Sequence, residues 1–113
     1  MTKHKIILVP FPFDDLTTNK VRPAVCLTDS IGPHNHVIVA FITSRATVVL
    51  LASDFLIDLY SDGFAQTGLR VSSTLRLHRL MTLSTGIIER ELGHLPTWMG
   101  LEVESRLRAL FGL

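Results

Sequence analysis

The sequence predicts a mainly β protein, a small β-barrel of short strands with one amphipathic α-helix at its C-terminal end. Three observations favour this fold class. Apolar, often β-branched segments of strand length alternate with turn-forming residues along most of the chain. Apolar residues then recur at helical spacing near the C-terminus. The length of 113 residues corresponds to one domain over residues 1–113, because domains commonly contain about 100 to 150 residues.

Three apolar segments in the first half of the chain are predicted as strands: residues 5–9, 21–27 and 36–42. Pro23 is compatible with the second because it lies near the start of that strand. The third is apolar at both alternating sets of positions, so we expect both of its faces to be buried. Polar or Gly/Pro-containing segments separate the three, and residues 47–51 are a candidate for a short fourth strand.

In the second half of the chain, periodicity leaves residues 54–60 open between strand and helix. Residues 73–83 are predicted as a long strand that ends at the turn Ser84-Thr85-Gly86. A helix is predicted to begin at Pro96-Thr97. Its apolar residues recur at helical spacing: Met99, Val103, Leu107 and Leu110.

Composition excludes several classes of protein. With 47% hydrophobic and 19% charged residues, the chain is not predicted to be disordered. Its mean hydropathy is +0.37, yet no apolar run approaches the roughly 18 residues that a membrane-spanning helix needs. The basic start Met1-Thr2-Lys3-His4-Lys5 is not followed by a small-residue cleavage site, so we expect no signal peptide. The single Cys26 can form no internal disulfide, which favours a reducing cytoplasm.

The distribution of charge is more informative than the net charge of +1. Neither Asp nor Glu occurs in residues 30–53 or 63–88. If these two stretches lie side by side, they form a local basic patch that could hold phosphate, and the alternative is ordinary scatter of charge on a surface. The basic residues and histidines of the two stretches are Arg45, Arg70, Arg76, Arg79, His34, His36 and His78.

The long strand 73–83 carries the main candidate for chemistry. Because side chains alternate along a strand, Leu75 and Leu77 are predicted to point into the core and Arg76 and His78 outward, about 6–7 Å apart. A guanidinium binds phosphate through a planar set of donors, and an imidazole gives or takes a proton near neutral pH. The pair therefore suits cleavage of a phosphodiester, although an Arg and a His on a solvated strand face are the structural alternative.

Other candidates are judged by their neighbours. Arg22 is a charged residue within an apolar strand, so either it has a functional role or its side chain reaches water at the strand end. Thr43-Ser44 either supplies two hydroxyls to a site or only forms a turn at the end of the strand. Cys26 lies among apolar residues and is predicted to be a buried, inert thiol. His34-Asn35-His36 lacks a third ligand, and Asp14-Asp15 lacks partners at a recognisable spacing, so no metal site is predicted.

Five segments, in their order and spacing, resemble the MazF/PemK toxin family over roughly the whole chain. They are Val9-Pro10-Phe11-Pro12-Phe13, Lys20-Val21-Arg22-Pro23-Ala24-Val25, Ile42-Thr43-Ser44-Arg45, Thr67-Gly68-Leu69 and Ser73-Thr74-Leu75-Arg76-Leu77-His78-Arg79-Leu80. The resemblance implies a small SH3-like barrel (CcdB/PemK-like) with a C-terminal α-helix, usually as a homodimer. It also implies a metal-independent endoribonuclease without cofactors, which cleaves single-stranded RNA to 2′,3′-cyclic phosphate and 5′-hydroxyl ends.

The resemblance implies roles for particular residues. Arg22, Thr43 and Arg76 correspond to the catalytic positions of the family, and Lys20, Ser44, Arg45 and Arg79 are expected to bind RNA. Known members carry an acidic residue two positions after the later Arg, whereas this chain has His78. The chain therefore either uses His78 as general acid or base or has lost activity and only binds RNA or antitoxin.

The resemblance also implies a cognate antitoxin that silences the toxin and, in complex with it, binds DNA. The alternative on the same fold is a non-enzymatic gyrase poison of the CcdB kind, which acts through an aromatic-Gly-apolar ending. This chain ends in Phe111-Gly112-Leu113. The absence of a membrane partner follows from the hydropathy pattern.

Overall fold

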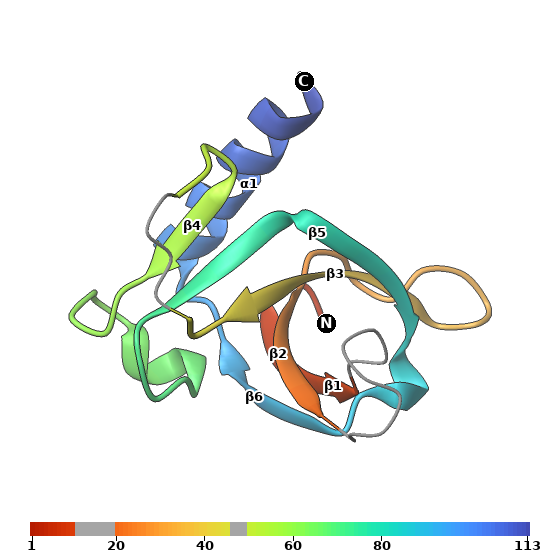
Figure 1. Ribbon diagram of the computed structural model, residues 1–113. Coiled ribbons are helices and arrows are strands. Elements are labelled where there is room, and N and C mark those ends of the chain that lie inside the picture. The colour runs from red at the N-terminus through yellow and green to blue at the C-terminus, as the bar shows by residue number, and fades with distance from the viewer. Residues whose placement is uncertain (11–19, 46–49) are drawn as a thin grey trace.

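The computed structural model describes residues 1–10, 20–45 and 50–113 (Figure 1). In these ranges an antiparallel sheet has the strand order β4-β5-β3-β2-β1-β6, and one α-helix packs against it. The strands are β1 (Lys5–Pro10), β2 (Val21–Cys26), β3 (His36–Thr43), β4 (Asp54–Ile57), β5 (Ser73–Ser84) and β6 (Arg90–His94). The helices are α1 (Thr97–Phe111) and the short 3₁₀ turns η1 (Phe64–Thr67) and η2 (Thr85–Ile87).

The sheet curls strongly, so that its strands run around a common interior (Figure 1). It does not close, because β4 and β6 are the two edges of the strand order. Two register shifts accompany the curl, one in β1–β6 between Ile6 and Ile7 and one in β3–β5 between Ala40 and Phe41. Such irregularities bend a strand and increase its twist. The predicted mainly β fold with a C-terminal helix is confirmed, in the form of a half-open barrel.

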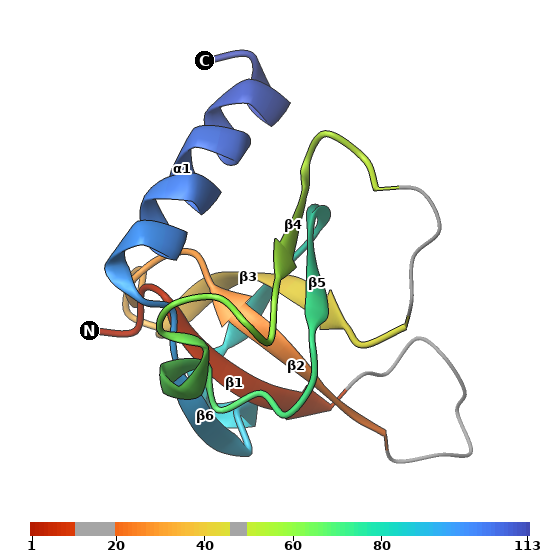
Figure 2. The ribbon, with the colours of Figure 1, turned by 90° about the vertical axis from the view of Figure 1, so that its left-hand side faces the viewer.

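Both faces of the curled sheet carry a hydrophobic core. One cluster includes Ile42, Leu75 and Leu77 and packs against Met99 and Val103 of α1. A second cluster lies on the opposite face: Ile7, Val9, Ala24, Cys26, Val37, Val39, Phe41 and Leu83. Figure 2 shows α1 along one side of the sheet, with its C-terminal part extending beyond it. The expectation that β3 is buried on both faces is confirmed, because its successive side chains enter the two clusters alternately.

The predicted strands 5–9, 21–27, 36–42 and 73–83 correspond to β1, β2, β3 and β5, and the helix begins at the predicted Thr97. The ambiguous segment 54–60 begins as strand β4, in which Phe55 and Ile57 are buried while Leu56 is 45% exposed. Burial of alternate side chains is what a strand requires. Most of the candidate strand 47–51 lies outside the described residues, and Leu50 and Leu51 are not in a strand.

Strand β6 was not predicted, because its sequence is polar and contains Gly93. The backbone of Gly93 lies so close to η1 that a Cβ would be 2.2 Å from the carbonyl oxygen of Gln66. A residue without a side chain is therefore required where β6 passes η1. Because this contact involves backbone atoms, it produces no pattern of apolar residues in the sequence of β6 that would predict a strand.

Candidate functional site

The sheet register brings three of the predicted site residues onto one face. Phe41 of β3 is paired with Ala24 of β2 on one side and with Arg76 of β5 on the other. Directly paired residues project to the same face, and so do residues two apart along a strand. Arg22, Thr43 and Arg76 therefore project from the same face of three neighbouring strands, toward the ends where β2 begins and β3 finishes.

A bend in β5 exposes the residues after Arg76. Phe41 is paired with Arg76, but the next residue along β3, Ala40, is paired with Leu80. Leu77 and Leu80 both pack against the α1-side cluster, although they are three residues apart. Strict alternation is therefore broken between them, and the intervening His78 and Arg79 are both exposed. Figure 1 shows β5 bending sharply along its length. Bulges commonly re-aim side chains next to functional sites in this way.

The buried carboxylate of Asp54 lies beneath this cationic pair. Asp54 is the first residue of β4 and is paired directly with Arg76 across the β4–β5 ladder. Its Oδ1 is 2.9 Å from Nε of Arg76 and 4.0 Å from Nδ1 of His78. The side chain of Asp54 is fully buried, whereas those of Arg76 and His78 are 25% and 38% exposed. The expected outward Arg–His pair thus has a carboxylate on its inner side.

The contact between Asp54 and Arg76 is an ion pair without a directed hydrogen bond. Although the two atoms are 2.9 Å apart, the Nε–H does not point at Oδ1, and neither atom has a hydrogen-bond partner among the described residues. The other carboxylate oxygen, Oδ2, accepts from the backbone N–H of Leu51 at 2.9 Å. One oxygen of Asp54 therefore holds the chain, while the other faces Arg76 and His78.

Arg106 of α1 fixes the backbone at the start of β4. Its Nη1 donates to the carbonyl oxygens of Ala52 and Asp54 at 3.0 and 2.7 Å. Its Nε donates to Glu102 one turn earlier, and its guanidinium lies over the ring of Phe55. The position of Asp54 is thus set from the helix as well as from the sheet.

The remaining predicted residues lie around this face. Oγ1 of Thr43 accepts from the backbone N–H of Arg45 at 3.2 Å, which forms a turn after β3, and no described residue accepts a hydrogen bond from this hydroxyl. Ser44 and Arg45 are exposed in that turn, and Lys20 is exposed directly before β2. Arg79 is exposed at the bend of β5. The two stretches free of acidic residues do lie side by side, because β3 pairs with β5.

Sequence reasoning missed Asp54 and Arg106. Asp54 lies directly after the acid-free stretch 30–53, and its neighbours in sequence do not indicate that it contacts Arg76. The available signal was a carboxylate immediately before Phe55 and Ile57, where alternation puts Asp54 on the face opposite to the core. Arg106 is a charged residue of the amphipathic helix, and the sequence near it does not indicate the backbone carbonyls of Ala52 and Asp54 to which it donates.

Two other sequence candidates have structural explanations. Cys26 is buried, and burial raises the pKa of its thiol to about 11, which agrees with the predicted inert thiol. The ring of His34, in the turn before β3, is tilted by 33° against that of His36, the first residue of β3, with centroids 6.0 Å apart. Within residues 1–10, 20–45 and 50–113, no cluster of three metal-ligating side chains is found. Asp14 and Asp15 lie outside these ranges. None of the described helices is long and apolar enough to cross a membrane.

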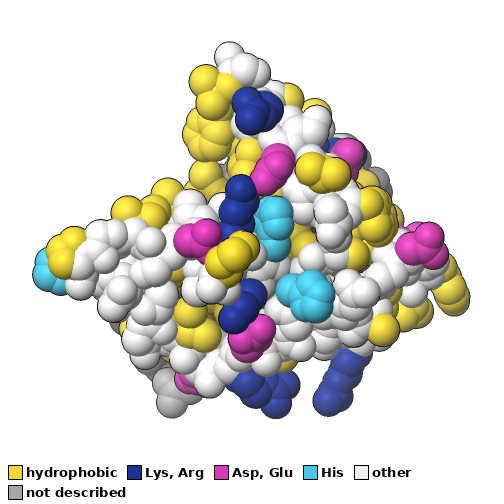
Figure 3. Space-filling model, turned by 180° about the vertical axis from the view of Figure 1, so that it is seen from behind, with side chains coloured by type: hydrophobic (Ala, Val, Ile, Leu, Met, Phe, Trp, Pro, Cys, Tyr) yellow, Lys and Arg dark blue, Asp and Glu magenta, His cyan; other side chains and the backbone are white. Residues whose placement is uncertain are grey.

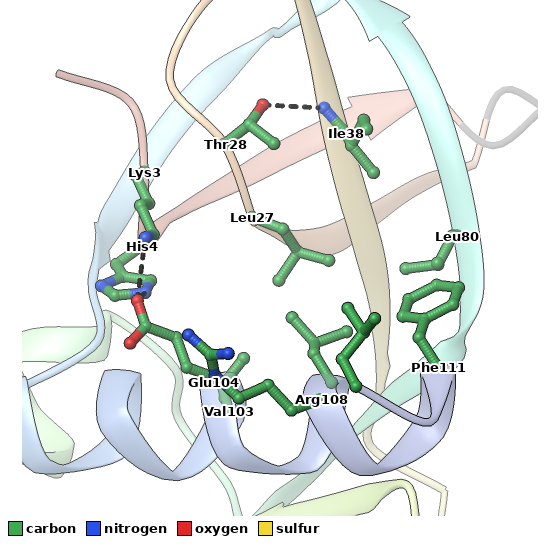
Figure 4. Close-up of a pocket in the computed structure, with 12 residues that line it drawn as sticks. Lys3, His4, Leu27, Thr28, Ile38, Leu80, Val103, Glu104, Arg108 and Phe111 are labelled. Atoms are coloured by element: carbon green, nitrogen blue, oxygen red, sulfur yellow. Dashed lines mark hydrogen bonds and ion pairs between the residues drawn. The ribbon is translucent and has the colours of Figure 1, made fainter.

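A groove of about 470 Å³ lies on the other side of the sheet, between α1, β3 and β5 (Figure 4). Its floor is apolar and includes Leu27, Ile38 and Leu80. At its rim the Nζ of Lys3 is paired with Glu104 at 2.8 Å. Because Leu80 belongs to the α1-side cluster and Arg76 to the opposite face, this groove is separate from the Arg76 site. Its polar lining includes His4, whose Nε2 lies 3.8 Å from Oε1 of Glu104.

Charge elsewhere on the surface is mixed. Viewed from behind, Lys and Arg, acidic and His side chains are interspersed, and hydrophobic side chains gather at the top around the end of α1 (Figure 3). Among the described residues, this face therefore carries no continuous basic surface.

Comparison with known proteins gives a family match and a set of structural neighbours. Residues 2–111 match the family described as PemK-like, MazF-like toxin of type II toxin-antitoxin system. No curated protein matches the sequence. The structure is similar to that of the Mycobacterium tuberculosis toxin MazF-mt6, with a TM-score of 0.72, 23% identity and coverage of 96% of this chain and 97% of that chain.

Two further solved structures are similar over the whole chain. An endoribonuclease in complex with its cognate antitoxin, from Mycobacterial species, has a TM-score of 0.69 and 14% identity, with 100% of this chain and 96% of that chain covered. MazF from Deinococcus radiodurans has a TM-score of 0.67 and 20% identity, with 100% and 97% covered. At these identities the likeness concerns the fold.

Proposed function

Since the chain belongs to the PemK-like, MazF-like toxins of type II toxin-antitoxin systems, we propose that it is a toxin that cleaves single-stranded RNA. The observation that supports this most directly is the common face of Arg22, Thr43 and Arg76 on neighbouring strands, with His78 exposed beside Arg76. Cations, a hydroxyl and a titratable imidazole are the groups that transesterification of RNA needs. One structural neighbour is described as an endoribonuclease in complex with its cognate antitoxin.

The proposed reaction is attack of a ribose 2′-oxygen on the adjacent phosphorus. His78, acting as base, takes the 2′-hydroxyl proton while the P–O5′ bond breaks, and the departing 5′-oxygen receives a proton from an acid. Arg76 and Arg22 stabilise the additional negative charge on the phosphoryl oxygens. The products are a 2′,3′-cyclic phosphate and a 5′-hydroxyl. Every heavy atom of the products comes from the RNA, so the proposed step needs no metal-bound water.

The other polar residues of this face would hold the RNA strand. The hydroxyl of Thr43 can donate to a phosphate, and Ser44 and Arg45 follow it in the same exposed turn. Lys20 and Arg79 add positive charge at two sides of the face. We assign Lys20, Arg45 and Arg79 to RNA binding, because ammonium and guanidinium groups form charge-assisted hydrogen bonds to phosphate.

The proposed biological setting is a cytoplasmic toxin–antitoxin pair. We propose that residues 1–113 act as one domain, that two copies form a homodimer, and that a cognate antitoxin covers the cationic face. One neighbour was solved as an endoribonuclease with its cognate antitoxin. An antitoxin segment that folds on binding would compete with RNA for the same charges, so a stoichiometric antitoxin is expected to abolish cleavage.

The experiment that tests the proposed function is incubation of the pure protein with a long single-stranded RNA in the presence of EDTA. We expect cleavage at short, recurrent sequences, with cyclic phosphate and 5′-hydroxyl ends after end mapping. Intact RNA at micromolar protein would contradict the proposal. Cleavage that requires Mg²⁺ would contradict the proposed metal independence.

A matched pair of histidine variants tests the assignment of His78. We expect His78→Ala to lose most of the cleavage rate, on the order of 10²-fold or more, because general acid–base groups contribute about 10²- to 10⁴-fold. His34→Ala is the control, since His34 is exposed in a turn and its ring lies near that of His36. If both variants cut RNA as fast as the wild type, the role given to His78 is wrong.

A further inference from the structure

We infer that Asp54 is a positioning residue, which orients the guanidinium of Arg76 and the imidazole of His78 toward the RNA. This inference rests on the proposed function and adds a residue that the sequence did not single out. It starts from the direct pairing of Asp54 with Arg76 across β4 and β5 and from the distances of 2.9 and 4.0 Å to Arg76 and His78.

The burial of Asp54 needs an explanation other than folding stability. Its carboxylate is fully buried, and Oδ1 has no hydrogen-bond partner among the described residues. A buried polar atom without a hydrogen bond costs free energy, and a buried ion pair stabilises a protein little against an apolar replacement. A polar residue in such a place is commonly retained for what it does to its neighbours.

The contact with Asp54 leaves the right part of Arg76 available. A guanidinium has five N–H donors on three nitrogens, and the nitrogen nearest to Asp54 is Nε, at 2.9 Å from Oδ1. The four N–H donors on Nη1 and Nη2 form an edge that can bind a phosphate with two parallel hydrogen bonds. The charge of Asp54 beside Nε therefore favours one orientation of the guanidinium, in which Asp54 does not occupy the Nη1–Nη2 edge.

The same oxygen selects the orientation of His78. With Nδ1 turned toward Asp54, the other ring nitrogen, Nε2, points away from the carboxylate. A proton on Nδ1 leaves the lone pair on Nε2, and this is the tautomer that can take a proton from a 2′-hydroxyl. When His78 has taken that proton, its charge lies 4.0 Å from Asp54, within the range of an ion pair.

Asp54 is held rigidly enough to serve as a reference point. Its Oδ2 accepts from the N–H of Leu51, and its carbonyl oxygen accepts from Arg106 at 2.7 Å. Phe55, which follows it, is buried in the α1-side cluster. Contacts of this kind keep a supporting carboxylate in place, so that it can hold the side chains that touch the substrate.

The variant that tests this role is Asp54→Asn, with Asp58→Asn as control. Asn keeps the shape and an acceptor for Leu51 but removes the charge, whereas Asp58 lies beyond β4 and bonds to Tyr60 and Ser72. We expect kcat to fall on the order of 10²-fold with little change in KM, because misorientation of catalytic groups acts on the transition state. Asp58→Asn should retain the wild-type kcat.

An NMR measurement tests the orientation independently of activity. In the wild type, ¹⁵N–¹H correlation spectra of the His78 ring should show the tautomer with the proton on Nδ1, and Asp54→Asn should shift His78 toward the tautomer protonated on Nε2. Folding is checked by circular dichroism. If Asp54→Asn does not fold, the wild-type spectrum decides alone: a proton on Nε2 at neutral pH overturns the inference.

The outcomes separate the two proposals. Wild-type cleavage together with an unchanged kcat and an unchanged His78 spectrum in Asp54→Asn overturns the inference and leaves the proposed function standing. Failure of the wild type to cleave RNA overturns the proposed function and, with it, the role of Asp54 in that reaction. A loss of kcat accompanied by the shift of tautomer supports both.

Discussion

The guanidinium of Arg106 donates to the carbonyl oxygen of Asp54 at 2.7 Å, and this bond joins α1 to the first residue of β4. The same side chain bonds to the carbonyl oxygen of Ala52 and lies over the ring of Phe55, 5.7 Å from its centroid. Because β4 is an edge strand, its outer side pairs with no strand among the residues that the structure describes. The hydrogen bonds from Arg106 hold the start of β4 in place from the side of α1.

We therefore expect Arg106→Gln to lower the free energy of unfolding by about 1–3 kcal/mol, the range for loss of partners by buried polar groups. Arg108→Gln, an exposed position on the same helix, is the control and should change stability by less than about 0.5 kcal/mol. Urea unfolding of the two variants measures the difference. Equal midpoints would show that β4 does not depend on this contact.

Gly68 is required where η1 meets β6. It has a φ of +73°, and a Cβ there would lie 2.1 Å from the carbonyl oxygen of Leu92, so Gly68→Ala adds a backbone clash to the strain of the left-handed conformation. Gly32 has a φ of +71° with nothing near its Cβ position and is the matched control. We expect losses of about 1–2 kcal/mol for Gly32→Ala and about 2–5 kcal/mol for Gly68→Ala in denaturant unfolding. Equal losses would mean that the backbones move apart at no cost.

Cys26 is expected to be unreactive in the folded protein. Burial raises its pKa to about 11, so the thiolate is a very small fraction at pH 8 and is also inaccessible. Titration with a disulfide reagent should give almost no reaction in buffer and one equivalent of thiol in denaturant. Rapid modification of the native protein at pH 8 would contradict both the burial and the raised pKa.

Stability is expected to fall as the pH drops below about 6.5, the ordinary pKa of histidine. Burial, and then the neighbouring charge of Lys3, lowers the pKa of His4 in spite of the attraction of Glu104 and Asp29. The unfolded chain therefore takes up a proton at a higher pH than the folded one, and protonation favours unfolding. Urea midpoints at pH 7.5 and below measure the effect.

His4→Asn is the variant that isolates the effect of His4 on stability at low pH. Its φ of 72° is one that Asn tolerates, so the backbone should be retained. We expect the loss of stability between pH 7 and the folded-state pKa of His4 to be smaller in this variant. A second loss is expected below about pH 4.5, because the bond from Lys3 lowers the pKa of Glu104. An unchanged profile in His4→Asn would place the low-pH sensitivity elsewhere.

The ending Phe111-Gly112-Leu113 has a structural explanation as a helix cap. Gly112 has a φ of 70°, its N–H donates to Ala109 and the N–H of Leu113 donates to Arg108, which together form a Schellman motif. Deletion of residues 111–113 should therefore lower stability modestly and leave RNA cleavage in place. Loss of toxicity on deletion, with cleavage by the wild type absent, would instead favour a gyrase poison.

Much of the fold could be predicted because its signals are local. The apolar runs of β1, β2 and β3, and the spacing from Met99 to Leu110 in α1, are properties of neighbouring residues. Segment 54–60 stayed ambiguous, since four residues of strand are too few for periodicity to show. Strand β6 was not predicted, because its residues are determined by the close contact of its backbone with η1 and not by an apolar face.

Only part of the candidate site could be predicted, because only part of it depends on residues that are neighbours in sequence. The sequence by itself determined that Leu75 and Leu77 point inward and that Arg76 and His78 point outward, because alternation is built into the extended backbone. Only the tertiary structure decided that Asp54 lies opposite Arg76. Pairing of β4 with β5 joins segments about twenty residues apart and is fixed by burial of Phe55 and by Arg106, which no local pattern records.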